Sequence, residues 1–201
     1  MWYRSLLGVL ALVALILAGP QTQARVVKGE AANKIAAAAA DYISSIDTLA
    51  SDFNFVTAKG KSNGHIFMDR GTQSIRMQFG DPLNHLLLVT GPLTKFFGGN
   101  GTIVEVATAG TPLSFLLYPK KSLATNIQVL EVDDRGANVF VAVAERDNVA
   151  GGQAILHFQR EPTWRLIDWG VYDQNGTFSK TVLGIQETGL RLDPALFVAP
   201  E

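Results

Sequence analysis

The sequence of 201 residues contains no cysteine, and this absence excludes several kinds of chemistry at once. The chain can form no disulfide, no thiolate metal site and no cysteine nucleophile. It also has no N-terminal cysteine to which a lipid could be attached, so it is not a lipoprotein anchored in that way.

Charge is sparse as well, with 17% charged residues and a formal net charge of -1. Because such a chain has no long-range field to gather polyanions, the sequence gives no case for nucleic acid or an anionic membrane surface as a partner. The length and the hydrophobic content of 47% instead predict one globular domain with one core.

Catalytic motifs are missing too. His65, His85 and His157 are the only histidines, and none lies in a His-x-x-x-His or His-Glu-x-x-His pattern that would hold zinc. There is no Gly-x-Ser-x-Gly elbow, and the glycines at 98–101 complete neither a phosphate loop nor a dinucleotide fingerprint. We therefore expect no metal, cofactor or ATP site and no enzyme activity. The alternative is a secreted β-rich hydrolase whose catalytic triad comes together only in the folded protein.

The first 24 residues are typical of an export signal. Arg4 supplies the positive charge, residues 6–17 form an apolar core, and Thr22-Gln23-Ala24 is a small-residue cleavage site. The apolar run is shorter than the ~20 residues that cross a hydrocarbon layer, which disfavours an uncleaved anchor. The prediction is a cleaved signal peptide over 1–24 and a single mature domain over 25–201 that is exported across the membrane.

Two helices are predicted. Between Glu30 and about Leu49 apolar residues recur at spacings of three, four and seven, and a run of alanines adds helix propensity. The segment 111–119 is a second, short helix, because Thr111 is a good N-cap, Pro112 fits the first helical position and Pro119 ends the segment. Since nearly every residue between the two prolines is apolar, a core or a ligand must cover this helix on more than one side.

Most of the remaining chain is predicted to be antiparallel strands separated by turn-forming clusters. The clearest is 74–79, where alternation sends Ile75, Met77 and Phe79 to one face and the polar residues to the other. Two or three strands, this one included, are expected within 64–89, and the others near residues 52–56, 103–106, 126–132, 139–143, 154–158, 164–169 and 178–185. Their regular spacing favours a meander in a sandwich or barrel.

The stretch 64–89 resembles the outer-membrane lipoprotein carrier proteins of Gram-negative bacteria (LolA-like). The resemblance rests on Gly64, on Arg70 at a strand end, on the strand 75–79 and on Pro82. Gly71 stands where that family usually has proline. Similar features, the Thr-Pro before the apolar helix and an Asp-turn, Phe and Pro near the end of the chain, extend the resemblance over most of residues 25–201.

The resemblance implies an α+β fold: an unclosed, half β-barrel of about ten or eleven mainly antiparallel strands, covered by an N-terminal helix and short lid helices, around a hydrophobic cavity. Eight residues match apolar positions that line the cavity or its lid: Ile43, Phe53, Ile75, Met77, Phe79, Leu113, Leu116 and Leu117. Arg70 matches an arginine that hydrogen-bonds the lid and keeps it closed, and an ordinary surface arginine is the alternative.

The function that the resemblance implies is that of a monomeric periplasmic carrier. It would bind the acyl chains of lipoproteins released by an inner-membrane ABC transporter and deliver them to an outer-membrane lipoprotein receptor. Two related proteins are alternatives. The receptor shares the fold but is lipidated on cysteine, which this chain lacks. A periplasmic sensor of lipids or lipoproteins on the same fold usually has an additional C-terminal domain.

Overall fold

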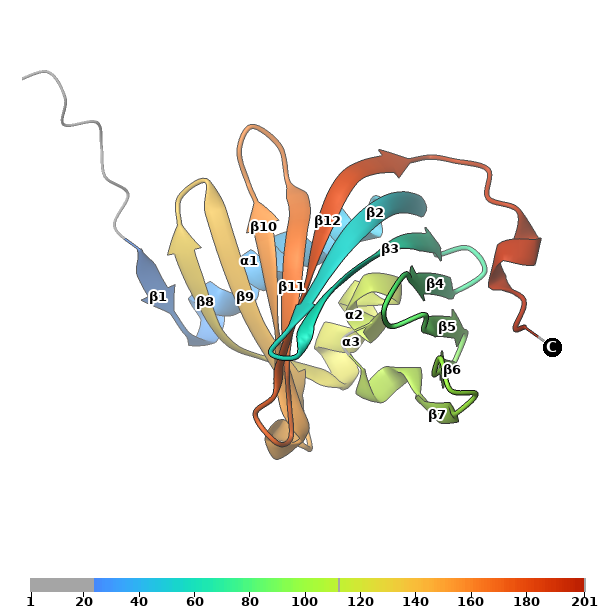
Figure 1. The fold of residues 1–201 in the computed structure, drawn as a ribbon. Helices are drawn as coiled ribbons and strands as arrows, with labels where there is room; N and C mark the ends of the chain where they lie inside the picture. Colours follow the sequence, from blue (N-terminus) through green and yellow to red (C-terminus); the bar gives the residue numbers. More distant parts are fainter. Residues whose placement is uncertain (1–23, 112, 201) are drawn as a thin grey trace, which may run out of the picture.

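A computed structural model describes residues 24–111 and 113–200, and these residues form one antiparallel sheet of twelve strands (Figure 1). The strand order is β1-β8-β9-β10-β11-β12-β2-β3-β4-β5-β6-β7, so β1 and β7 are the two edges of an unclosed sheet. The strands are β1 Arg25–Val27, β2 Thr48–Thr57, β3 Gly60–Asp69, β4 Ser74–Phe79, β5 Leu86–Thr90, β6 Leu93–Phe97, β7 Ile103–Ala107, β8 Ile127–Arg135, β9 Asn138–Glu145, β10 Gly152–Gln159, β11 Arg165–Asp173 and β12 Phe178–Thr188.

This architecture confirms the predicted fold class, with twelve strands where about ten or eleven were expected. Every predicted strand is present. The two unpredicted strands are β1, which pairs with β8, and β6, which lies in a region that the sequence marks as rich in turns. Residues 1–23 of the predicted signal peptide lie outside the described part of the chain.

The N-terminal helix α1, Gly29–Ser44, packs against β8 and the short helix α3, Pro119–Thr125. Its buried residues recur at helical spacing: Ala32, Ala36, Ala39, Ala40 and Ile43. Small alanines let the helix approach the sheet closely. The prediction that this helix reaches Leu49 is wrong, because Leu49 pairs with Met68 of β3 and lies within β2.

The short helix α2, Leu113–Leu117, lies with α3 inside the bend of the sheet (Figure 1). As predicted, α2 ends before Pro119, but a further short helix, α3, that was not predicted begins at this proline. Pro119 occupies the first turn of α3, where its missing N–H costs nothing. The hydroxyl of Thr111 donates to the carbonyl oxygen of Thr108, and Pro112 lies outside the described residues.

Candidate functional site

The inner wall of the bend is built by β4 and its neighbours. Ile75, Met77 and Phe79 all point into the interior and are at most 8% exposed. The ring of Phe53 on β2 meets that of Phe79 edge to face at a centroid distance of 5.1 Å. Gly64 lies beneath these rings, where a Cβ would come within 2.5 Å of the Phe53 ring, so the glycine of the sequence motif makes room for the aromatic wall.

The opposite wall is α2, whose five residues are all buried. The eight apolar residues predicted to contact lipid come together in one hydrophobic cluster: Ile43, Phe53, Ile75, Met77, Phe79, Leu113, Leu116 and Leu117. Phe115, which the sequence comparison did not single out, is fully buried in the same cluster and is the largest side chain of α2. In this structure α2 therefore fills the interior that a ligand would have to share.

One polar group interrupts this apolar packing. The side-chain oxygen of Ser114 in α2 is buried and has no hydrogen-bond partner among the described residues. The carbonyl oxygen of the same residue is satisfied, because the Ser122 hydroxyl donates to it at 3.0 Å. Leaving a buried hydroxyl unpaired costs about 1–3 kcal/mol, so the packing of α2 carries an energetic penalty at Ser114.

Arg70 lies at the end of α1. Its Nη1 donates to the carbonyl oxygen of Ile43, in the last turn of α1, at 2.8 Å and to that of Ile46, just beyond the helix, at 3.5 Å. The cation is also favourably placed for the negative end of the helix dipole. The hydrogen bonds that we find for Arg70 in the described residues thus fasten α1 to the β3 end, and its predicted role as a latch on segment 111–118 stays a prediction.

A different side chain joins the α2 region to the sheet. The Tyr118 hydroxyl, between α2 and α3, donates to Oε1 of Gln73 at 2.9 Å. It also lies 3.4 Å from the carbonyl oxygen of Gly91, so it reaches two turns at the edge of the inner wall. Burial raises the pKa of this tyrosine further above neutrality. Sequence reasoning missed this contact because its partners are 45 and 27 residues away.

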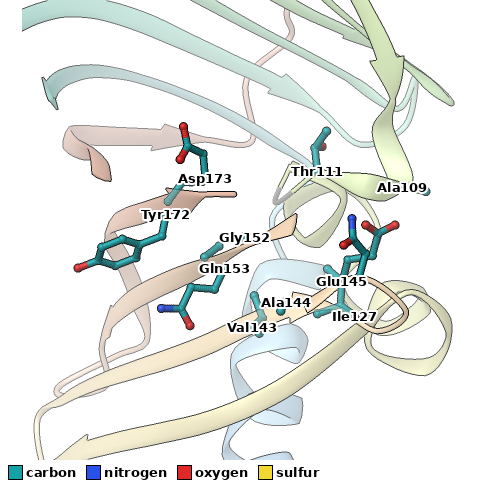
Figure 2. A pocket seen from close by; sticks show the side chains of 13 residues that line it. Ala109, Thr111, Ile127, Val143, Ala144, Glu145, Gly152, Gln153, Tyr172 and Asp173 are labelled. Atoms are coloured by element: carbon teal, nitrogen blue, oxygen red, sulfur yellow. The ribbon is translucent and has the colours of Figure 1, made fainter. Parts of the chain in front are cut away.

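A cavity of about 190 Å³ opens beside the segment that precedes α2 (Figure 2). Ile127, Val143 and Ala154 are among its apolar lining residues, and Glu145 and Asp173 also line it. Main-chain N–H groups of Thr177 and Asn175 donate to Asp173 and hold the pKa of its carboxyl below the usual value. The lining thus combines apolar side chains with two acidic ones.

A larger groove of about 680 Å³ lies between α1, α3 and β8. Ile127 lines both this groove and the smaller cavity, so its side chain stands at their junction. Alanines of α1 and α3 and Leu123 form part of the groove, and Lys120 pairs with Asp41 across the two helices at 2.8 Å. The volume of this groove is in the range of small-molecule sites, whereas that of the smaller cavity is below it.

The outer face of the sheet carries a partly buried polar network. His157 lies 3.0 Å from Asp168 through Nδ1 and 3.0 Å from Asn138 through Nε2, and Lys180 pairs with the same aspartate. Phe140 stacks on the imidazole at 4.2 Å. Both ring nitrogens of this histidine thus have hydrogen-bond partners on neighbouring strands. The described residues contain no cluster of three or more His, Cys, Asp or Glu placed to hold a metal ion.

No helix among the described residues is long and apolar enough to span a membrane.

Comparison with known proteins gives matches of structure and none of sequence: no family model and no curated protein matches the chain. An uncharacterized conserved protein from Thermus thermophilus is similar in fold, with a TM-score of 0.50 and 7% identity over 84% of this chain and 94% of that one.

Two further solved structures match less closely. MucB matches with a TM-score of 0.48 and 15% identity, and the match covers 83% of this chain and 63% of the MucB chain. A LolA superfamily protein from Nitrosomonas europaea, NE2245, matches with a TM-score of 0.45 and 9% identity over 82% of this chain and 97% of that one. At such identities structural likeness concerns the fold alone, and no sequence family is assigned.

Proposed function

We propose that this protein is a periplasmic carrier that takes the acyl chains of lipoproteins into its bent sheet and transfers them to the outer membrane. The observation that carries the proposal is α2: a five-residue, wholly buried apolar helix that occupies the interior and contains an unpaired hydroxyl. In the protein without ligand, α2 makes the apolar contacts with the sheet that bound acyl chains would make in the loaded protein.

The energetics favour such an exchange. Each methylene withdrawn from water contributes ~0.8 kcal/mol, so an acylated protein leaves a membrane only for a site that encloses most of its chains. The interior wall of Ile75, Met77, Phe79 and Phe53 is continuous and apolar, as that task requires. If α2 withdraws while acyl chains enter, the apolar area of the inner wall that α2 uncovers is covered again by the acyl chains. The net free-energy cost of loading therefore stays small.

The route and the partners follow from the sequence resemblance. We propose that cargo comes from an inner-membrane ABC transporter and passes to an outer-membrane lipoprotein receptor, with the chain exported by its N-terminal segment. Because a net charge of -1 gives no attraction to an anionic surface, we propose that the protein recognises its cargo by the acyl chains.

The test is lipoprotein release. The protein is expressed with its own N-terminal segment, purified, and incubated with spheroplasts of a Gram-negative host. We expect triacylated lipoproteins to appear in the soluble fraction in a one-to-one complex with it. A variant with Met77→Asp on the inner wall should release none, whereas His65→Asn, on the exposed side of β3, should release as much as the unmodified protein.

Each failure has a distinct meaning. If the folded, monomeric protein releases no lipoprotein, the carrier proposal is wrong. If it binds acylated ligands in solution without extracting them from the membrane, the sensor alternative takes its place.

A further inference from the structure

The sheet ends at β7 with an unprotected edge. All five residues of β7 are exposed, and three of them are β-branched and apolar: Ile103, Val104 and Val106 are 62%, 49% and 46% exposed. Within residues 24–111 and 113–200, no strand neighbours the main-chain groups on the outer side of β7. An exposed apolar edge of this kind is a ready template for another strand.

The usual devices that block edge pairing are absent from β7. The strand contains no proline or lysine, and its pairing with β6 runs from Leu93–Ala107 to Phe97–Ile103 without a register shift. Its one charge, Glu105, is paired with Lys95 on β6 at 3.0 Å. The opposite edge is different, because β1 has only three residues and begins with Arg25.

The register places Val104 on the interior face. Val104 lies opposite Phe96, which lies opposite Leu87, which in turn lies opposite Met77 of the inner wall. Beside it, a hollow of about 540 Å³ is lined in part by Phe96, Val104 and Leu83. The apolar interior therefore continues outward to the exposed edge.

The strand is complementary to a second copy of itself. If two antiparallel β7 strands were related by a twofold axis at Val104, this residue would face the Val104 of the second copy. Because Phe96 on β6 lies opposite Val104 in each copy, the four side chains would form one apolar row across four strands. In the same register Glu105 would face the partner's Ile103 and not the partner's Glu105, which avoids opposing like charges. Residues 102–106 of the two copies would then pair.

We propose that β7 is a self-association edge, through which two copies form a continuous sheet by antiparallel β7–β7 pairing centred on Val104. A second copy is favoured over a lipid surface because only a strand can satisfy the free main-chain groups. Five paired residues make a small interface, so the dimer is weak and forms with rising concentration. This inference does not rest on the carrier function.

Sedimentation velocity over a wide range of protein concentrations tests the association. We expect a monomer–dimer equilibrium that Val104→Lys abolishes, because it places two like charges at the twofold axis. Ile185→Lys is the matched control, since Ile185 is 85% exposed on β12, away from either edge. A protein that stays monomeric at every concentration, or a Val104→Lys variant that dimerises like the parent, overturns the proposal.

Disulfide trapping tests the register. Because the chain has no native cysteine, an introduced cysteine can form a disulfide only with its counterpart in the second copy. Under mild oxidation Val104→Cys should form a covalent dimer, because directly opposed residues have Cα atoms about 4.5–5.5 Å apart. Glu105→Cys should not, since its counterpart is displaced along the strand. Trapping of Glu105→Cys alone, or binding of the edge to neutral lipid vesicles with no dimer in solution, would refute self-pairing at Val104.

Discussion

The hydroxyl of Tyr118 donates a 2.9 Å hydrogen bond to Oε1 of Gln73, and this contact ties the chain just after α2 to the turn between β3 and β4. Tyr118→Phe keeps the ring and removes the donor. The free energy that holds α2 in place should fall by about 0.5–1.5 kcal/mol. Hydrogen exchange of amides 113–117 should then become roughly two- to tenfold faster.

The control for that variant is Tyr172→Phe, at a tyrosine on the outer face that packs against Phe178. Its exchange at 113–117 should equal that of the parent. Equal exchange in Tyr118→Phe and the parent would show that the Tyr118 contact does not hold α2.

Ser114→Ala should make the protein more stable and a poorer binder. It removes the unpaired buried hydroxyl, so the free energy of unfolding should rise by about 1–2 kcal/mol. Because the gain belongs to the packed position of α2, affinity for an acylated peptide should fall. Denaturant unfolding measures the stability, and titration of the same preparation with the acylated peptide measures the affinity.

Ser122→Ala supplies the matched comparison, because its hydroxyl donates to the Ser114 carbonyl oxygen and is itself buried. We expect this variant to lose stability. A Ser114→Ala protein that is also less stable would mean that the hydroxyl has a partner in solution, and the penalty assigned to α2 would be withdrawn.

Arg70→Ala should loosen the end of α1. The loss of a charged hydrogen bond to the Ile43 carbonyl should lower the free energy of unfolding by about 1.5–3 kcal/mol. Exchange should rise first at residues 41–46. Arg76→Ala removes a similar bond, to the Leu196 carbonyl oxygen on the outer face, and should leave α1 protected.

The same pair of variants tests the lid-latch prediction for Arg70. Faster exchange at 113–117 in Arg70→Ala alone would support it. Faster exchange confined to α1 would limit Arg70 to helix docking, and unchanged exchange at both places would remove both roles.

Tyr42 predicts an alkaline limit to stability. Burial raises its pKa in the folded protein above the unfolded value of 10.0, although the Leu166 N–H and Arg165 partly offset the rise. The neutral phenol is thus favoured by folding, so its contribution is complete below pH 10 and is lost as the pH rises through the higher folded pKa. Denaturant unfolding across this range should show a shallower alkaline decline in Tyr42→Phe than in the parent.

A matching alkaline decline in Tyr42→Phe and the parent would mean that Tyr42 is not the group responsible. Tyr118, whose pKa burial also raises, contributes with the same sign and would then be examined in the Tyr118→Phe variant.

Local pattern was sufficient for much of the fold. The alternation of Ile75, Met77 and Phe79 predicted their shared face, and the apolar run before Pro119 predicted a buried short helix. Period and turn chemistry are properties of neighbouring residues, so they can be recognised in the sequence. Leu49 was misplaced on a helix because its pairing with Met68 is a contact between distant residues.

The site needed three dimensions for the same reason. The sequence resemblance implied that Arg70 hydrogen-bonds the lid, but the bond that the structure shows, to the Ile43 carbonyl oxygen, depends on how α1 crosses the sheet. The Tyr118–Gln73 bond and the unpaired Ser114 hydroxyl depend on packing, which no spacing in the sequence encodes. Likewise the exposure of β7 follows from its position at the end of the sheet.

The central claim is that acyl chains and α2 compete for one interior. Hydrogen exchange of residues 113–117 should be followed while the protein is titrated with a synthetic triacylated peptide. The account predicts that α2 loses protection in proportion to bound ligand and saturates at one ligand per chain, while β9, β10 and β11 keep theirs. Binding that leaves α2 as protected as in the free protein would contradict the account.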